Sequence, residues 1–146
     1  MLCGVIIGTE RNVSHKAAGM RTYALVSMGA ALIVIINELF IASFAARGIP
    51  FSDTLQIPSM IVSGIGFMGA GMIVFRNSLG VTGLTTASGL WVAAGIGIAC
   101  GAGFFVPAIM ATILTIFILE VLWRVEQRVK KFSAEKLEAE QREFPQ

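Results

Sequence analysis

Charged residues are almost absent from a long central stretch of this chain. Between Thr22 and Trp123 the only ones are Glu38, Arg47, Asp53, Arg76 and Glu120. A water-soluble fold needs charge over its whole surface and is about a quarter charged, whereas this chain is 14% charged. The distribution predicts lipid as the solvent. The alternative, a buried helical bundle inside a larger soluble complex, does not account for apolar runs of bilayer length.

Four apolar segments have the length of a membrane-spanning helix, which needs about 20 mostly apolar residues. They are Thr22–Ala46, Ile57–Phe75, Thr85–Val106 and Pro107–Trp123, the last two separated by a turn at Gly101–Pro107. Leu2–Gly8 is apolar but too short to span, so we expect its helix to begin ahead of Met1 or to enter the membrane only part way. The sequence therefore predicts an all-α fold: a polytopic membrane helical bundle of four full transmembrane helices plus an N-terminally truncated first helix.

Basic residues are distributed unevenly between the two sides of this bundle. Eight of them would share one side: Arg11, Lys16, Arg21, Arg76, Arg124, Arg128, Lys130 and Lys131. Only Arg47 would lie on the other side. Because short cytoplasmic loops are enriched in Lys and Arg, the bias predicts a cytoplasmic C-terminus and an N-terminus outside.

The chain changes character at residue 124, so we expect a transmembrane domain over residues 1–123 and a charged cytoplasmic helical tail over 124–146. Three pairs of opposite charges four residues apart support a helix in the tail, since such pairs share a helical face. They are Glu126 with Lys130, Lys131 with Glu135 and Lys136 with Glu140. The tail is interpreted as a solvated extension, with partner binding as the alternative.

Glycines are concentrated in two of the apolar segments. One contains Gly64, Gly66, Gly69 and Gly71, and the next repeats small residues every four positions at Gly89, Ala93, Gly97 and Gly101. In lipid, helices associate through the close backbone approach that small residues allow. We therefore expect tight packing there and a helix that can be interrupted at Gly64–Gly71. The match of Gly64–Gly69 to G-x-G-x-x-G does not indicate dinucleotide binding, because no strand precedes it and no acidic residue follows about 20 positions on.

Residues that carry catalysis or bind metals are sparse. Cys3 and Cys100 are far apart in apolar surroundings, and His15 is the only histidine. No Cys/His cluster or paired carboxylates at helical spacing occur within the apolar segments. The sequence predicts no enzyme, no metal site, no cofactor and no nucleic-acid partner.

Three ordered blocks resemble the MgtC/SapB family of bacterial inner-membrane proteins, over roughly residues 5–105. They are Ile7–Arg11 running to Ala18–Thr22, then Val62–Gly71, then Gly83–Ala87 through Leu90 and Trp91 to Gly97. The resemblance implies five transmembrane helices, an outside N-terminus and a cytoplasmic C-terminus. The best-known branch of the family also has a folded cytoplasmic C-terminal domain. With only a short tail, this chain resembles the shorter SapB-like members, and it departs from the family pattern at Met20, Gln56 and Met68.

Family members are associated with growth under magnesium limitation and with virulence, and the best-known branch regulates other membrane machines such as the F-type ATP synthase. The resemblance thus implies a non-enzymatic regulator in the bacterial inner membrane. Its partners would be the lipid bilayer and another membrane protein or a second copy of itself. The alternative is a small magnesium or proton transporter, or a subunit of one, because broken helices often build ion sites. Ligands for such a site are scarce, since mid-membrane positions offer only Ser63 and backbone carbonyls.

Polar residues also gather at the predicted cytoplasmic edge. We expect Glu10, Arg11, Arg21, Thr85 and Thr86 to converge there. One acid against two arginines beside a helix N-terminus leaves positive charge that could hold an anionic lipid or phosphate group. The alternative interpretation is structural: Glu10 pairs with an arginine, the threonines cap their helix, and the arginines anchor the bundle.

Overall fold

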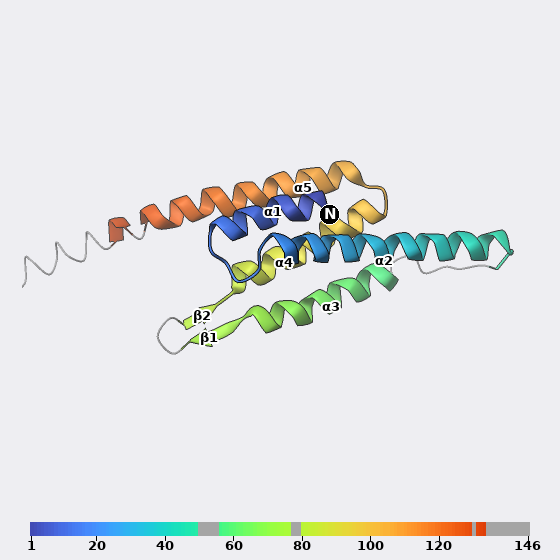
Figure 1. Cartoon of the computed structure of the whole chain (residues 1–146), viewed down its shortest axis with the longest axis horizontal. Coiled ribbons are helices and arrows are strands. Elements are labelled where there is room, and N and C mark those ends of the chain that lie inside the picture. Colours follow the sequence, from blue (N-terminus) through green and yellow to red (C-terminus); the bar gives the residue numbers. More distant parts are fainter. Residues whose placement is uncertain (50–55, 77–79, 130, 134–146) are drawn as a thin grey trace, which may run out of the picture. The chain divides into compact units, whose positions relative to one another are not determined.

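The computed structural model describes residues 1–49, 56–76, 80–129 and 131–133, and these are mostly helical (Figure 1). The helices are α1 (Leu2–Val13), α2 (Met20–Ala46), α3 (Gln56–Met72), α4 (Leu84–Gly101) and α5 (Phe105–Phe117), followed by a π-helical turn, η1 (Ile118–Leu122). A short antiparallel hairpin of β1 (Val74–Arg76) and β2 (Gly80–Thr82) joins α3 to α4. The chain forms two compact units, Met1–Thr115 and Ile116–Gln146, and each is described here by itself.

Three helices are long and apolar enough to cross a membrane. They are Met20–Ala46, Leu84–Gly101 and Phe105–Ser133. Helix α3 has 17 residues and α1 has 12, so both are shorter. The fold is therefore an all-α membrane helical fold, with three candidate spans among the described residues where the sequence predicted four.

The segment predicted as the span Ile57–Phe75 differs from the prediction at its C-terminal end. Its helix stops at Met72, and the last predicted residues enter β1. Glycines with positive φ permit the reversal that follows: Gly80 has φ +69° and Gly83, which precedes α4, has φ +92°. The helix also continues without a break through Gly64–Gly71, so the expected interruption there was wrong.

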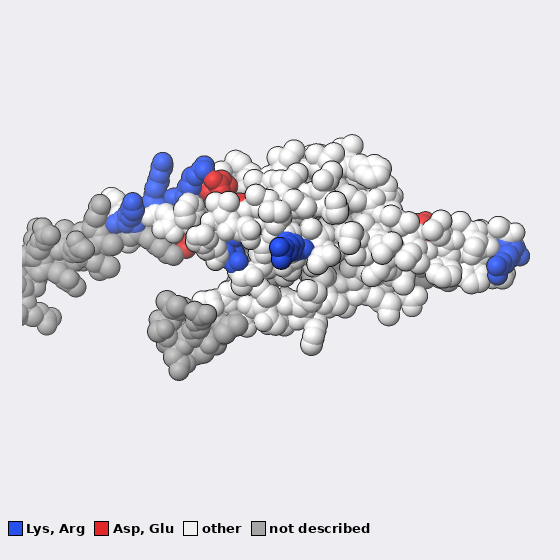
Figure 2. Space-filling model, in the orientation of Figure 1, with Lys and Arg blue, Asp and Glu red and all other residues white. Residues whose placement is uncertain are grey.

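Helix α2 packs against both α1 and α4, while α3 packs mainly against α4. The buried positions of α2 are spaced alternately four and three residues apart, and they are Tyr23, Ser27, Ala30, Val34 and Asn37. Large apolar side chains such as Leu32, Leu39 and Phe40 are exposed instead. This arrangement suits lipid, in which small and polar residues mediate contact between helices and apolar ones face the solvent. On the face shown in Figure 2, the body of the molecule is accordingly almost uncharged.

Glycines allow the backbones of the inner helices to approach closely. In α1, a Cβ added at Gly4 would strike the Tyr23 carbonyl, and one added at Gly8 would lie 2.5 Å from the Met20 Cα. In α4, a Cβ at Gly97 would strike the Ser27 carbonyl oxygen, and one at Gly101 would lie 2.6 Å from that of Ala31. Gly97 and Gly101 thus lie in the interface between α4 and α2.

The glycines of α3 differ in their surroundings. A Cβ at Gly69 would be 3.6 Å from the Ala87 Cβ of α4, which is ordinary contact. At Gly64, Gly66 and Gly71 it would meet nothing within 4 Å among the described residues. Among the described residues, therefore, Gly69 is the only one of the four where an added Cβ would contact a neighbouring helix. Gly64 instead lines an open apolar groove of about 610 Å³ between α2 and α3.

In the C-terminal unit the helix continues beyond η1, and Arg124 forms an i,i+4 ion pair with Glu120. Both side chains are exposed, so the pair contributes little to stability. The three charge pairs predicted for the tail each include Lys130, Glu135 or Lys136, which lie outside the described residues.

Candidate functional site at one end of the bundle

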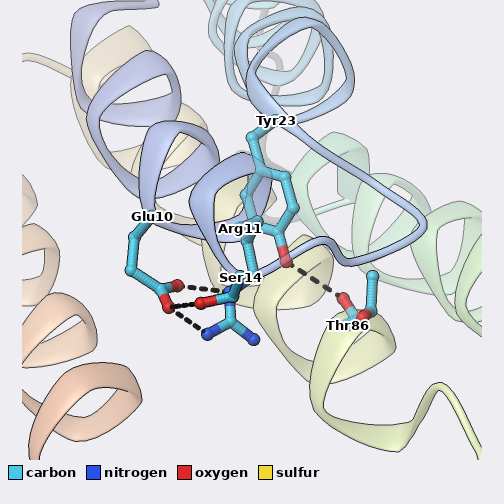
Figure 3. Close-up of polar contacts among 5 residues, drawn as sticks. All are labelled: Glu10, Arg11, Ser14, Tyr23 and Thr86. Carbon is cyan, nitrogen blue, oxygen red and sulfur yellow. Dashed lines mark hydrogen bonds and ion pairs between the residues drawn. The ribbon is translucent and has the colours of Figure 1, made fainter.

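The end of α1 and the beginnings of α2 and α4 meet at one end of the bundle (Figure 1). The chain reaches this point because α1 reverses into α2 within residues 14–19, where His15 adopts φ +52°. The turn is held by backbone hydrogen bonds, including Lys16 N–H to the Arg11 carbonyl at 3.0 Å. Polar side chains from all three helices gather here, as Figure 3 shows.

Arg11 is the most buried charged residue among those described, with 3% of its surface exposed. Its guanidinium forms two parallel bonds to Glu10: Nε donates to Oε2, and Nη2 donates to Oε1 at 2.6 Å. Ser14 Oγ donates a further hydrogen bond to Glu10 Oε1 at 2.9 Å. The carboxylate therefore has three donors, and such a bidentate pair is geometrically specific.

These donors set the protonation of Glu10. Partial burial raises the pKa of this carboxyl group. The hydrogen bonds from Arg11 and Ser14, together with the arginine's positive charge, outweigh that effect and hold the pKa of Glu10 below its usual range. Glu10 is consequently ionised at neutral pH, and one full positive charge of the site is neutralised locally.

Tyr23 connects α2 to α4 next to this pair (Figure 3). Its hydroxyl donates a hydrogen bond to the backbone carbonyl of Thr86 at 3.2 Å (Figure 3). Gly89 makes room for the ring, because a Cβ there would strike the Tyr23 hydroxyl. Thr86 is buried, with 4% of its surface exposed. The Tyr23 side chain thus joins α2 to α4, whereas the Glu10 and Arg11 pair lies within α1 and bonds to Ser14 of the turn.

The two remaining residues of the predicted cluster lie differently. Arg21 and Thr85 are exposed, and neither side chain forms a hydrogen bond or ion pair with a described residue. Arg21 precedes the buried Tyr23 by two residues. At about 100° per residue, the two side chains lie about 200° apart around α2, so Arg21 points to the opposite side of the helix. The structure therefore brings Glu10, Arg11 and Thr86 together and leaves Arg21 and Thr85 outside.

Arg21 instead lines an open hollow of about 540 Å³ next to the α1–α2 turn. Asn12, Gly19, Met20 and Thr22 complete its lining. Asn12 rests against Gly19, where an added Cβ would strike its Oδ1. This hollow presents an unneutralised guanidinium at a helix N-terminus, so its chemistry suits an anion.

The sequence interpretation missed Tyr23 and Ser14. A signal for both was present: Ser14 follows Glu10 by four residues, which places them on one helical face. Tyr23 begins the alternating four- and three-residue series of small and polar positions in α2.

The sequence as a whole now decides the family. A family model described as MgtC family matches residues 1–128. The chain belongs to the MgtC family. The resemblance noted in the three sequence blocks is thereby confirmed. No solved structure matches the protein.

Curated relatives carry names from the same family. "Putative magnesium transporter YhiD" of Escherichia coli K12 is 38% identical over 127 residues, which are 87% of this chain and 58% of the relative. "Protein MgtC" of Brucella abortus (strain 2308) is 39% identical over 133 residues, 91% of this chain and 52% of the relative. "Protein MgtC" of Salmonella typhi is 40% identical over 140 residues, which are 93% of this chain and 56% of the relative. The chain spans about half the length of these relatives.

Chemically, the site in this MgtC-family protein joins α2 to α4 through Tyr23 and presents the exposed Arg21 guanidinium beside it. Among the described residues there is no group of three or more His, Cys, Asp or Glu side chains that could hold a metal ion. Arg11 is committed to Glu10, so Arg21 is the side chain of the predicted cluster that offers positive charge to a ligand.

Proposed function

We propose that this MgtC-family protein is a non-enzymatic regulator of another integral protein of the bacterial inner membrane, acting in adaptation to magnesium limitation or in virulence. The names of its relatives support a magnesium-related context. The observation that carries the proposal is the surface of α3 at Gly66, where an added Cβ would meet nothing within 4 Å among the described residues.

Uncovered glycines in a helix need an explanation. Each costs about 1 kcal/mol of helix stability relative to alanine. Inside a bundle, close packing between helices accounts for such glycines. Gly97 and Gly101, for example, let the backbone of α4 approach that of α2. On α3 only Gly69 has such a neighbour. A helix of a partner protein, approaching α3 backbone to backbone, would use Gly66 in the way that small residues are used in membranes. Gly66 lies about 200° around the helix from Gly64, which lines the groove toward α2.

The experiment is affinity capture from membranes after mild crosslinking, at native expression level. Gly66→Leu fills the uncovered surface of α3, and because a Cβ there meets nothing within 4 Å among the described residues, we expect the bundle to keep its packing. Gly95→Leu is the matched control, since Gly95 of α4 is equally open. We expect one reproducible membrane partner, lost in Gly66→Leu and kept in Gly95→Leu. A wild-type chain that is always captured alone contradicts the proposal.

For the topology, we propose four membrane passes in the described helices, with α3 as the shortest. At about 1.5 Å per residue its 17 residues extend about 26 Å, close to the thickness of the hydrocarbon core. The end that carries Arg11 and Arg21 is then cytoplasmic by the positive-inside rule. Membrane-impermeant thiol labelling of Lys16→Cys and Gly103→Cys, with Cys3 and Cys100 replaced, tests this: only Gly103→Cys is expected to react from outside.

At the cytoplasmic end, we propose that the hollow beside Arg21 holds an anionic lipid headgroup or a phosphate group. The support is the free guanidinium next to the start of α2. Native mass spectrometry of the purified protein distinguishes the two sources. Retention of an anionic phospholipid, lost in Arg21→Ala, indicates a headgroup, whereas binding of added inorganic phosphate to delipidated protein indicates the free ion. Binding of neither contradicts the proposal.

A small magnesium or proton transporter is the second candidate, favoured by the printed name of the Escherichia coli relative. The unbroken α3 argues against the interrupted-helix ion site that such a function commonly uses. Reconstitution into liposomes that contain a magnesium dye and a pH dye separates the candidates. The regulator predicts no flux above empty liposomes, and a flux proportional to protein would replace it with the transporter.

A further inference from the structure

The open apolar groove between α2 and α3 has a volume of about 610 Å³. Its walls come from residues 25–33 of α2 and 57–68 of α3, and every residue that lines it is apolar or glycine. Gly29 and Gly64 keep it open, because an added Cβ at either would meet nothing within 4 Å among the described residues. The groove therefore offers hydrocarbon walls and no hydrogen-bonding side chain.

The groove adjoins the hollow that Arg21 lines. Leu25 of the groove follows Arg21 of the hollow by four residues, and Val26 follows Thr22 by four. Residues four apart are neighbours on one face of a helix, so the two linings are consecutive along α2. Arg21 is exposed and forms no hydrogen bond or ion pair with a described residue. A free positive charge thus lies at one end of an apolar groove.

The length of the groove matches one leaflet of a bilayer. On α2 its lining begins about 7.5 Å beyond Met20 and continues for about 12 Å, and on α3 it covers about 16 Å, at about 1.5 Å per residue. The hydrocarbon core is about 30 Å thick, so one leaflet contributes about 15 Å. In the proposed topology the Arg21 end is cytoplasmic, and the groove then runs from the cytoplasmic surface toward the middle of the membrane.

We infer that the groove holds an acyl chain of an anionic phospholipid whose headgroup lies at Arg21. The occupant must carry an anion at the membrane surface and hydrocarbon below it, and such a lipid has both in that order. A second copy of this chain fits less well, because its Glu10 and Glu120 are already paired with Arg11 and Arg124. The inference rests on the proposed headgroup site at Arg21 and identifies its ligand as a phospholipid. It does not depend on a protein partner at Gly66.

The test is native mass spectrometry of the purified full chain. The protein is released from detergent micelles that contain equal amounts of phosphatidylglycerol and phosphatidylethanolamine with identical acyl chains. We expect wild type to retain phosphatidylglycerol in preference to phosphatidylethanolamine. Gly29→Leu and Gly64→Leu fill the groove from its two walls, and each should retain about tenfold less phosphatidylglycerol, because the added side chain overpacks the space that the acyl chain needs.

Gly66→Leu is the matched control for the groove variants. Gly66 is equally open, but it lies about 200° around α3 from Gly64 and is not part of the lining. This variant should retain phosphatidylglycerol as wild type does. Arg21→Ala tests the headgroup separately and should lose the preference for phosphatidylglycerol over phosphatidylethanolamine.

The outcomes separate the inference from the headgroup proposal. If Arg21→Ala loses the lipid while both groove variants keep it, the inference is overturned and the headgroup site stands. If Arg21→Ala keeps its preference, or if wild type retains no phosphatidylglycerol, both fail. Equal loss in Gly66→Leu and Gly64→Leu also overturns the inference, since the lipid would then lie elsewhere.

The same spectra report whether a second copy fills the groove. A wild-type dimer that Gly64→Leu abolishes without changing phosphatidylglycerol binding would overturn the inference. Because Gly29 and Gly64 lie on different helices, a folding defect in one variant leaves the other to decide the result.

Discussion

Replacing Arg11 by alanine should strongly destabilise the fold. The guanidinium is 3% exposed and the Glu10 side chain 12% exposed, so both charges are largely removed from water. Alanine would leave the carboxylate with Ser14 as its single side-chain donor. Breaking a buried ion pair by removing one partner costs about 3–5 kcal/mol. Glu10 keeps some exposure to solvent and its hydrogen bond from Ser14. The loss of unfolding free energy in Arg11→Ala should therefore lie at the lower end of this range, about 3 kcal/mol.

A double-mutant cycle separates the pair from the loss of packing. Its single variants are Glu10→Leu, which leaves a buried guanidinium unpaired, and Arg11→Leu, which leaves the carboxylate without the guanidinium. Each should be about as costly as Arg11→Ala. The combined variant Glu10→Leu/Arg11→Leu should recover most of the loss, since apolar replacement of a buried pair is often close to neutral. With single losses of about 3 kcal/mol each and a double variant close to neutral, the coupling energy should be about 5 kcal/mol. Arg21→Ala, at an exposed residue of the same surface, should cost about 0.5 kcal/mol or less.

The assay is reversible unfolding in mixed micelles, in which far-UV circular dichroism is followed against the mole fraction of sodium dodecyl sulfate. The reasoning is refuted if Arg11→Ala costs less than about 1 kcal/mol. It is equally refuted if the double variant loses the sum of the two single losses, because the two charges would then not be coupled.

Three further predictions concern the same bundle. Arg21→Ala should keep normal abundance in the membrane but fail to restore growth at low magnesium to a strain that lacks the protein; disappearance from the membrane would make Arg21 a folding residue. Gly97→Leu should lose about 1–3 kcal/mol through overpacking against α2 while Gly95→Leu folds normally, as measured by size-exclusion chromatography; equal behaviour would contradict the packing described. The pKa of Glu10 is lowered in the folded state, so its ionised form stabilises the fold. This stabilisation is fully present above the unfolded pKa of about 4.3 and is lost as the pH falls through the folded pKa. The free energies of unfolding of wild type and Glu10→Gln should therefore converge only at acid pH.

Much of the fold could be predicted because lipid imposes strong constraints on sequence. The apolar run that begins at Thr22 and the run that begins at Thr85 became α2 and α4 nearly as expected. The end of α3 could not be predicted, because Val74 and Phe75 continue the apolar run into β1. Only the backbone angles at Gly80 and Gly83 reveal that the chain reverses there.

The part of the candidate site that depends on interactions between residues close in sequence could be predicted. The cost of an unpaired charge at the edge of hydrocarbon predicts a guanidinium for Glu10, and Arg11 supplies it. The direction of Arg21 was not predictable, since it depends on how α2 is rotated about its axis. That rotation follows from the contact of Gly8 with the Met20 backbone and from the burial of Tyr23, which are tertiary facts.

The central claim is that the uncovered surface of α3 receives another membrane protein. A photo-crosslinking amino acid placed at position 66 in living cells tests it most directly, with the same amino acid at position 95 of α4 as the control. We predict a light-dependent adduct with a single heterologous membrane protein from position 66 and none from position 95. Adducts only with lipid or with a second copy of this chain from position 66 would contradict the claim.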